Sequence, residues 1–263
     1  MLSARQWFKG ALITGMFALG LLAVSVIMPL ARKILGPKAT AINDRIQSTW
    51  NWLVCRILGV RIHIGGQPMP EAGLTVANHI SWLDIIVLGG LHHLTFVSKQ
   101  EVADWPVMGV LARRIGTLFI KRGDAEQAAA TGEQMAWLLR QGKHLMLFPE
   151  GTTTTGERVL RFHGKLFQPA QLAHVPVQPV AIRYLNEAGE VAPFIGEDEF
   201  LPHLINVLKL RHIDISLHYC TPLPAGLHRN VLSASARKQI VDALDAETGM
   251  REAASRHKAV IQL

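Results

Sequence analysis

The sequence predicts an α/β fold, a mixed sheet covered by helices, preceded by a membrane-attached helical segment at the N-terminus. From residue 59 onward, short apolar runs alternate with stretches of helical periodicity, a pattern typical of strands connected by covering helices. An uncharged stretch of 22 residues lies before them at residues 10–31. The 263 residues, of which 49% are hydrophobic, suffice for one domain with a substantial core plus such a segment. We therefore predict an N-terminal segment at residues 1–58 and an α/β domain at residues 59–263.

The net charge of +7 is concentrated at the N-terminus. Residues 1–65 hold 8 of the 27 Lys and Arg residues but only 1 of the 20 acidic residues. A nucleic-acid-binding protein more often carries its basic patch on the folded domain, so we expect no nucleic-acid partner. The two cysteines, Cys55 and Cys220, fit a reducing compartment and match no metal-ligand spacing. We expect no bound metal.

The uncharged stretch GALITGMFALGLLAVSVIMPLA is long enough to cross a membrane. As a helix it extends about 33 Å, and no clear cleavage site follows it, so a retained anchor is favoured over a signal peptide. Pro29 is expected to kink its end. More positive charges follow the stretch than precede it, which favours the cytoplasmic face for the rest of the chain.

A second amphipathic helix is predicted directly after the anchor. Its apolar positions recur at helical spacing: Ile42, Ile46, Trp50, Leu53, Val54 and Ile57. Polar residues lie on the opposite side: Asn43, Gln47, Ser48 and Asn51. Either the helix packs on the domain, or it lies in the membrane interface, as its two tryptophans and basic flanks suggest. The two N-terminal helices together form either a span followed by an interfacial helix or a monotopic hairpin.

After Gly59 the periodicity changes to that of strands. The predicted strands cover residues 60–64, 74–77, 94–98, 117–121, 144–148, 177–184 and 213–219. Helical patterns lie near residues 82–91, 106–114, 124–142 and 231–257. This alternation indicates a sheet with helices on its faces.

His79 and Asp84 are conspicuous within the apolar stretch VANHISWLDIIVLGG, residues 76–90. His79 follows a predicted strand, and α/β folds place reactive groups at strand ends. Residues five apart on a straight helix point about 140° apart, so the two side chains meet only if His79 precedes the helix in a turn. Ser81 as N-cap and Asp84 three residues later form a capping-box-like pattern that predicts such a turn.

Two interpretations of this pair are open. Asp84 is either a capping carboxylate at a helix N-terminus, with His79 satisfied by backbone, or the two form a catalytic pair. In a catalytic pair the carboxylate orients one ring nitrogen while the other takes a proton from a hydroxyl. No protein nucleophile is then needed, because the base activates a substrate hydroxyl directly.

The segment NHISWLD resembles the N-H-x4-D signature of the glycerolipid acyltransferase family, whose archetype is 1-acylglycerol-3-phosphate acyltransferase. Three further segments resemble the family's later blocks in the family's order: FVSKQEVADWPVMGVLARRIGTLFIKR (96–122), LFPEGT (147–152) and VPVQPVAI (175–182). The resemblance extends over about residues 70–185 and implies an acyltransferase domain.

The resemblance also implies residue roles. His79 is expected to deprotonate the acceptor hydroxyl as it attacks an acyl thioester, and Asp84 to hold the imidazole tautomer. Arg122, assisted by Lys121, is expected to bind the acceptor's phosphate. The expected substrate-binding residues are Lys99, Lys121, Arg122, Glu150, Gly151 and Thr152.

One departure from the family pattern concerns the acceptor. The third block usually continues Gly-Thr-Arg-Ser, whereas Thr153 stands here at the position of the Arg. Either Arg158, Arg161 or Lys165 supplies the missing cation, or the acceptor is less anionic. Lyso-ornithine lipid acyltransferases resemble this Thr-rich form, so this acceptor is an alternative to lysophosphatidate.

Other classes of function are disfavoured. The chain has no G-x-S-x-G elbow and no H-E-x-x-H motif, which disfavours the corresponding hydrolases. A non-catalytic membrane lipid-binding protein is the remaining alternative, and the intact His79, Asp84 and Glu150 set argues against it.

The sequence therefore predicts a membrane enzyme with its catalytic domain on the cytoplasmic face. It is expected to transfer a fatty acyl group from acyl-CoA or acyl carrier protein to a lysolipid, with lysophosphatidate as the leading acceptor. Membrane lipids are its expected partners, and no cofactor is expected.

Overall fold

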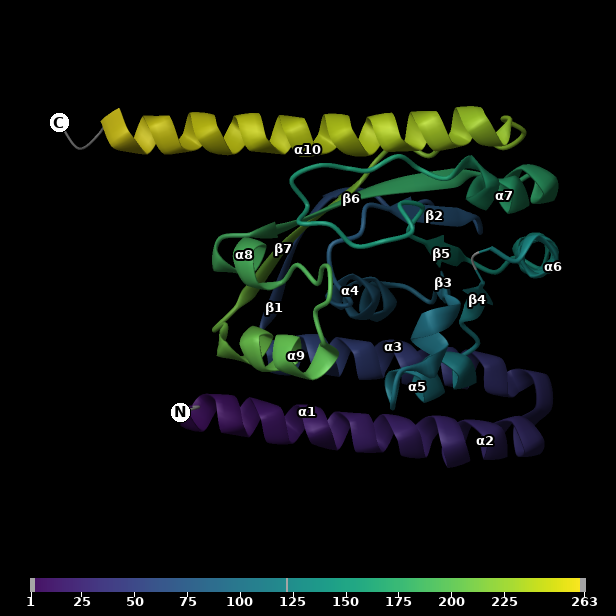
Figure 1. Ribbon diagram of the computed structural model, residues 1–263. Helices are drawn as coiled ribbons and strands as arrows, with labels where there is room; N and C mark the ends of the chain where they lie inside the picture. The colour runs from purple at the N-terminus through teal and green to yellow at the C-terminus, as the bar shows by residue number, and fades with distance from the viewer. Residues whose placement is uncertain (1–2, 122, 261–263) are drawn as a thin grey trace.

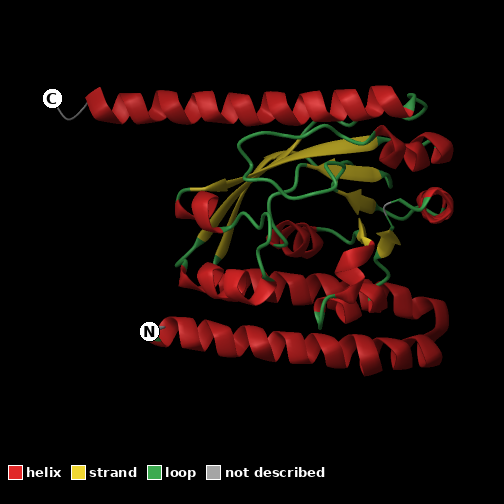
Figure 2. Ribbon diagram, viewed as in Figure 1, coloured by secondary structure: helices red, strands yellow, loops and turns green. Residues whose placement is uncertain are grey.

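The computed structural model describes residues 3–121 and 123–260, and its centre is a seven-stranded mixed sheet (Figures 1 and 2). The strands are β1 (Val60–Gly66), β2 (Leu74–Ala77), β3 (Thr95–Lys99), β4 (Leu118–Ile120), β5 (Leu145–Leu147), β6 (Val177–Leu185) and β7 (Ile213–Tyr219). Each coincides with one of the seven apolar runs in the sequence. The predicted α/β fold with a mixed sheet is therefore confirmed.

The strand order is β1-β7-β6-β2-β5-β3-β4, and every neighbouring pair is parallel except β6 and β7. β2 lies at the centre between β6 and β5. The carboxyl ends of β2, β3, β4, β5 and β6 consequently meet at one edge of the sheet, where open α/β sheets bind their ligands. The segments that follow these strands contain the motif residues.

The predicted helices are present as α4 (Leu83–Leu91), α5 (Met108–Arg114), α6 (Ala125–Arg140) and α10 (Arg229–Val260). Several shorter elements are not predicted from the sequence: η3 (Gln100–Asp104), η4 (Gly164–Phe167), α7 (Gln168–Ala173), α8 (Glu187–Val191) and α9 (Phe200–Lys209). Most of them are too short to display a helical period. In α9, Pro202 lies in the first turn, where a helix tolerates proline. In the sequence alone, the same proline argues against a helix at this position.

Helices cover both faces of the sheet and bury two apolar cores (Figure 2). On one face α6, α7 and α10 pack over a core that includes Met135, Phe167 and Ile240. On the other face α4 and α9, together with the N-terminal helices, enclose a core that includes Leu83 and Val207. The sheet is thus the middle layer between two helical layers.

The N-terminal helices form an antiparallel hairpin. Its first arm runs without interruption through α1 (Ala4–Leu22), the π-helical turn η1 (Ala23–Ile27) and α2 (Met28–Leu35). After η2 (Gly36–Lys38), the second arm is α3 (Ala39–Leu58). A π-helical turn directly precedes Pro29, where the sequence predicts a kink, and this wider turn accommodates a residue without a backbone N–H.

Polar contacts fix the first arm to the domain. Lys9 Nζ donates to the carbonyls of Leu58 and Leu210, at 2.9 and 3.0 Å, and these carbonyls lie at the carboxyl ends of α3 and α9. Further along, Trp50 Nε1 donates to the carbonyl of Met16 at 2.7 Å. The arm therefore packs against α3 along the hairpin and against the end of α9 in the domain.

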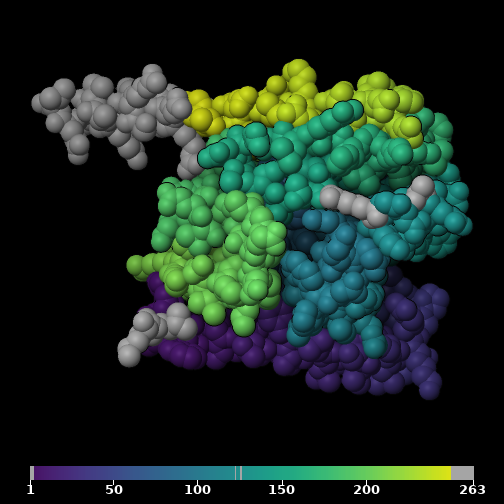
Figure 3. Space-filling model, in the orientation of Figure 1, coloured from purple at the N-terminus to yellow at the C-terminus, as the bar shows by residue number. Residues whose placement is uncertain are grey.

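The outer surface of the hairpin is apolar. The first arm buries one residue about every turn, at Ile13, Met16, Gly20, Val24 and Met28. Large apolar side chains on its other sides are exposed: Trp7, Phe8, Leu12, Leu19, Leu22, Val26, Ile27, Leu30, Ile34 and Leu35. The hairpin forms the lower face of the molecule in Figure 3, opposite α10. It is also the one described helical segment that is long and apolar enough to cross a membrane.

In α3 the expected amphipathic pattern is present only in part: Val54 is buried in the core, and Trp50 and Ile57 pack against it. The polar residues Asn43 and Asn51 are buried against the domain, whereas Ile42, Trp52 and Leu53 are exposed. An added Cβ on Gly89 of α4 would lie 2.5 Å from the Asn51 amide nitrogen, so the two helices approach closely here. Of the two interpretations of this helix, packing on the domain is confirmed for the side that carries Asn51 and Val54, while Ile42 and Leu53 face outward.

We predict that Lys9→Ala lowers the stability of the protein by about 1–3 kcal/mol, because two helix-terminal carbonyls lose a charged donor in a half-buried position. Thermal unfolding in detergent measures this loss. Lys33→Ala is the control, since Lys33 is an exposed lysine of the same arm. Equal unfolding temperatures for the two variants would contradict the proposed attachment.

Candidate active site

The motif residues gather at the carboxyl edge of the sheet. His79 lies two residues beyond β2, Glu150 and Gly151 follow β5, Lys99 ends β3, and Lys121 comes directly after β4. Parallel pairing of β2 with β5, of β5 with β3 and of β3 with β4 brings these strand ends together. Segments that are about 20 to 70 residues apart in the sequence thereby form one site.

His79 and Asp84 are hydrogen-bonded partners. His79 Nδ1 lies 2.8 Å from Asp84 Oδ2, and the same oxygen accepts the backbone N–H groups of Ile80 and Ser81 at 2.8 and 3.0 Å. The carboxylate thus folds the turn between β2 and α4 while it holds the imidazole. Both interpretations of Asp84, as a turn-forming carboxylate and as the partner of His79, apply at once.

The predicted start of the helix is wrong by one residue. α4 begins at Leu83 with Trp82 at its N-cap, and no side chain caps it. Ser81 contributes its backbone N–H to Asp84 rather than a capping hydroxyl. The carboxylate therefore replaces Ser81 as the group that organises this turn.

A residue outside the predicted site completes the surroundings of Asp84. The Tyr184 hydroxyl, at the end of β6, donates to Asp84 Oδ1 at 2.7 Å. Burial, and then the charge of Asp84, raise the pKa of Tyr184 well above its ordinary value. The phenol is therefore a permanent donor. The sequence showed Tyr184 only as the last aromatic residue of a strand.

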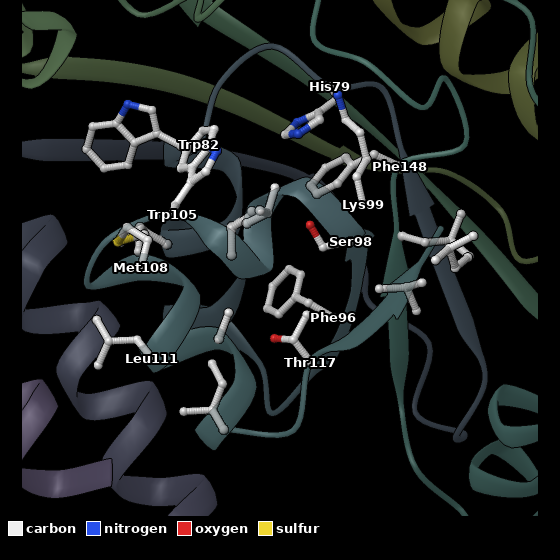
Figure 4. A pocket seen from close by; sticks show the side chains of 18 of the residues that line it. His79, Trp82, Phe96, Ser98, Lys99, Trp105, Met108, Leu111, Thr117 and Phe148 are labelled. Atoms are coloured by element: carbon white, nitrogen blue, oxygen red, sulfur yellow. The ribbon is translucent and has the colours of Figure 1, made fainter. Parts of the chain in front are cut away.

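The His79 ring is fixed in orientation and open on one side. It stacks on Phe148 with ring centroids 3.8 Å apart and planes inclined by 11°. Because Nδ1 faces Asp84, Nε2 is the nitrogen left for a substrate proton. Figure 4 shows the ring beside Phe148 and Lys99 at the rim of a cavity.

Glu150 is buried behind His79 and does not line the cavity. Its Oε1 accepts the His79 backbone N–H at 2.9 Å, and its Oε2 accepts that of Leu160 at 2.7 Å. Burial raises the pKa of Glu150, and these two bonds, with the charges of His79 and Arg237, oppose that shift. Glu150 therefore ties the His79 turn to the loop after β5, rather than contacting the acceptor directly.

The loop after β5 folds back onto the His79 turn. Gly151 has a φ of 69°, in the left-handed region that favours glycine. Thr154 donates its backbone N–H to the carbonyl of His79 at 2.9 Å, and the Thr153 hydroxyl donates to the carbonyl of Phe194. Thr153 thus connects the loop to the segment around Phe194, another residue of the cavity wall.

The cavity has a volume of about 780 Å³. His79 and Lys99 lie side by side at one end of the cavity (Figure 4), and its wall also carries Lys121, Thr153 and Lys165. From there it extends between α4, α5 and the hairpin, where the lining is apolar and includes Phe96, Trp105, Met108, Leu111, Val24 and Met28 (Figure 4). The arrangement suits a molecule with a long apolar chain whose reactive end lies beside His79.

Only some of the other predicted substrate-binding residues line the cavity. Lys99 and Gly151 line the cavity, as does Lys121, which is largely exposed and lies 3.8 Å from the Asp124 carboxylate. Thr152 is half-buried and lies off the cavity wall. Arg122 lies outside the described residues.

Two further expectations concern cations. Of the three candidates to replace the family's Arg, Lys165 lines the cavity, whereas Arg158 and Arg161 are exposed elsewhere on the loop. Among the residues that the structure describes, no group of three or more His, Cys, Asp or Glu side chains is arranged to hold a metal ion.

Known proteins resemble this chain in sequence and in fold. The family model described as Acyltransferase matches residues 61–183. A lyso-ornithine lipid O-acyltransferase from Pseudomonas aeruginosa is 38% identical over 91% of this chain and 93% of its own length. A 1-acyl-sn-glycerol-3-phosphate acyltransferase from Neisseria gonorrhoeae is 37% identical over 48% of this chain and 50% of its own.

The fold is shared with a solved structure. The crystal structure of the 1-acyl-sn-glycerophosphate (LPA) acyltransferase from Thermotoga maritima superposes with a TM-score of 0.62. The match covers 90% of this chain and 97% of that one, at 18% sequence identity. At this identity the likeness concerns the fold alone.

We predict that the stability of the native protein relative to a Glu150→Gln variant falls as the pH rises from about 4.5. Because burial raises the pKa of Glu150, the folded protein retains a proton that the unfolded chain has already lost, and this contribution to stability disappears as the pH passes the raised pKa. Denaturant unfolding between about pH 4 and pH 7 measures the difference. Glu157→Gln, at an exposed glutamate of the same loop, is the control. If the stability of Glu150→Gln changed with pH in parallel with that of the native protein, the prediction would be contradicted.

Proposed function

The chain belongs to the acyltransferase family, and we propose that it moves a fatty acyl group from a thioester to the free hydroxyl of a lysolipid, with His79 as general base. One observation carries the proposal. A buried Asp84 holds His79 Nδ1, so that Nε2 faces a cavity that is polar at this end and apolar beyond it. A lysolipid and an acyl thioester share this combination of a polar reactive group and a long apolar chain.

The proposed reaction needs no protein nucleophile. Nε2 of His79 takes the proton from the acceptor hydroxyl as its oxygen attacks the thioester carbonyl. The tetrahedral intermediate collapses, the carbon–sulfur bond breaks, and the imidazolium returns the proton to the departing thiolate. Asp84 stabilises the imidazolium between these steps. The products are an ester and a free thiol.

The proposed donor is acyl-CoA or acyl carrier protein. A thioester is already activated for acyl transfer, so the reaction requires no metal or redox cofactor. The apolar part of the cavity, lined by Phe96, Met108 and Leu111, supports an acyl chain as ligand.

We favour a lyso-ornithine lipid as the acceptor. The relative with this activity matches 91% of the chain, and the position of the family's Arg is Thr153, whose hydroxyl is engaged with Phe194. An ornithine headgroup carries a carboxylate rather than a phosphomonoester, so it needs fewer cations. Lysophosphatidate, the leading acceptor from the sequence, stays the second candidate, supported by the relative from Neisseria gonorrhoeae and by three lysines on the cavity wall: Lys99, Lys121 and Lys165.

An acceptor panel with labelled acyl-CoA and labelled acyl carrier protein tests the proposal. We expect acylation of lyso-ornithine lipid above that of lysophosphatidate and other lysophospholipids, and a loss of roughly 10²- to 10⁴-fold in His79→Ala. Asn43→Ala, a buried polar residue of α3, is the control for folding. Full turnover by His79→Ala would refute the mechanism, and labelling confined to lysophosphatidate would refute the favoured acceptor.

A Thr153→Arg variant adds a second arm to this panel. The added cation should lower the KM for lysophosphatidate by about tenfold, the effect of one charge-assisted hydrogen bond. A Thr153→Val variant is the control, because it removes the contact with Phe194 without adding charge. An unchanged preference in Thr153→Arg would show that this position does not select the headgroup.

We also propose that the N-terminal hairpin lies within one leaflet on the cytoplasmic face rather than spanning the membrane. Lys9 holds the first arm to the ends of α3 and α9, and Trp50 of α3 donates to the carbonyl of Met16, so this side of the arm is unavailable to lipid. The remaining sides are apolar, as interfacial helices require. Thioester donors are cytosolic, which supports the cytoplasmic face.

Charges placed on the apolar surface of the hairpin should release the protein from membranes. We expect Leu19→Glu with Val26→Glu to weaken binding to vesicles roughly thirtyfold per side chain, the effect of withdrawing about 2 kcal/mol of apolar burial each. Vesicle flotation measures it. The control, Val231→Glu with Ala234→Glu, adds the same charge on α10 at the opposite face of the molecule, and equal binding of the two variants would contradict the proposal.

A further inference from the structure

We propose that Tyr184 is a positioning residue that tunes the His79–Asp84 pair and thereby sets the pH range of the reaction. The inference rests on the proposed role of His79 as general base. It concerns a contact between β6 and α4 that brings together residues 100 positions apart in the sequence.

The two oxygens of the Asp84 carboxylate have different surroundings. Among the described hydrogen bonds, Oδ2 accepts three, from His79 Nδ1 and from the N–H groups of Ile80 and Ser81. Oδ1 accepts the Tyr184 hydroxyl at 2.7 Å. The local turn therefore fixes one oxygen, and the phenol fixes the other. Rotation of the carboxylate, which would break the bond to His79, is opposed from both sides.

The position of Tyr184 is fixed by the sheet. β6 runs parallel beside β2, so the end of β6 lies next to the turn that carries His79. Asn78, in this turn, exchanges two hydrogen bonds with the backbone of Ile182, at 2.9 and 2.8 Å. These bonds hold the end of β6 in register with the His79 turn and leave the Tyr184 side chain directed at Asp84.

The phenol also affects the charge on Asp84. A hydroxyl that donates to the carboxylate partly neutralises it, and in a completely buried site no water replaces this donor when it is removed. Without the hydroxyl, the negative charge acts more strongly on the imidazole, so the pair binds its proton more tightly. A general base that must lose a proton before reaction then requires a higher pH.

Other titratable and charged groups lie near the His79–Asp84 pair. Glu150 faces the His79 backbone from the loop after β5, and Arg237 of α10 contacts that loop through the carbonyls of Val159 and Leu160. Cys55 of α3 lies near Tyr184, and burial raises the pKa of its thiol to about 12. Lys99 lines the cavity beside His79. A Tyr184→Phe change alters none of these side chains.

The chain provides a matched control, because it has two tyrosines, both buried and both hydrogen-bonded through the hydroxyl. Tyr219, on the adjacent strand β7, lies 2.6 Å from His92 Nε2 at the far end of α4. Tyr184→Phe should move the acid limb of the pH profile of kcat/KM to higher pH by about half to one unit and lower kcat about three- to tenfold. Tyr219→Phe should leave the acid limb in place.

A second change at Tyr184 should shift the acid limb of the pH profile in the opposite direction. In the Tyr219→Phe background, global replacement of tyrosine by 3-fluorotyrosine modifies Tyr184 alone. The more acidic phenol is a stronger donor, so the acid limb should move to lower pH. A role for Tyr184 in packing alone predicts no such opposite shifts.

The outcomes separate this inference from the proposed function. If His79→Ala is inactive while both Tyr184 changes leave the acid limb unmoved, the positioning role is wrong and the general base stands. If His79→Ala remains active, the proposed mechanism itself is wrong. In an Asp84→Asn background, Tyr184→Phe should no longer shift the profile, and a persisting shift would overturn the route through Asp84.

Discussion

The buried carboxylate of Asp84 is the interaction on which the site depends. An ionised carboxylate without solvent is costly unless it is paired and hydrogen-bonded. Four donors meet it here, from His79, from two backbone N–H groups of the same turn and from Tyr184. Satisfying this one group requires the turn after β2, the start of α4 and the end of β6 to take their observed positions. The catalytic geometry and the local fold are therefore the same arrangement.

The second constraint is that the hairpin has to fit two environments, the folded domain on one side and an apolar medium on the other. The hairpin contacts the domain through one stripe of its first arm and through the side of α3 that carries Asn51 and Val54, while large apolar side chains on its other sides face outward. The same hairpin forms part of the cavity wall through Val24 and Met28. The surface that would contact lipid and the space that would receive an apolar chain thus belong to the same helices. A lipid-modifying enzyme gains from this because its acceptor and product both reside in the membrane.

The sequence predicted most of the framework because its signals are local. Each of the seven strands is an apolar run bounded by turns, and the longer helices display their period. The motif spacing placed His79 before a helix and Asp84 within its first turn. Elements such as α7 and α8, too short to show a period, gave no signal. The predicted Ser81 cap failed because the Asp84 carboxylate, not a hydroxyl, satisfies the backbone of this turn.

The sequence by itself determined the α/β class, the strands, the apolar N-terminal segment and the turn that places His79 shortly before a helix. These depend on periodicity, on apolar runs and on residues a few positions apart. Only the tertiary structure decided that His79 pairs with Asp84, that Tyr184 reaches the same carboxylate, that Phe148 stacks on His79, that Glu150 supports the site from behind, and that Asn51 of α3 faces inward. Each of these depends on strand order and on helix packing between distant segments. The free energy of such contacts comes from burial and hydrogen bonding across the fold, which no local pattern records.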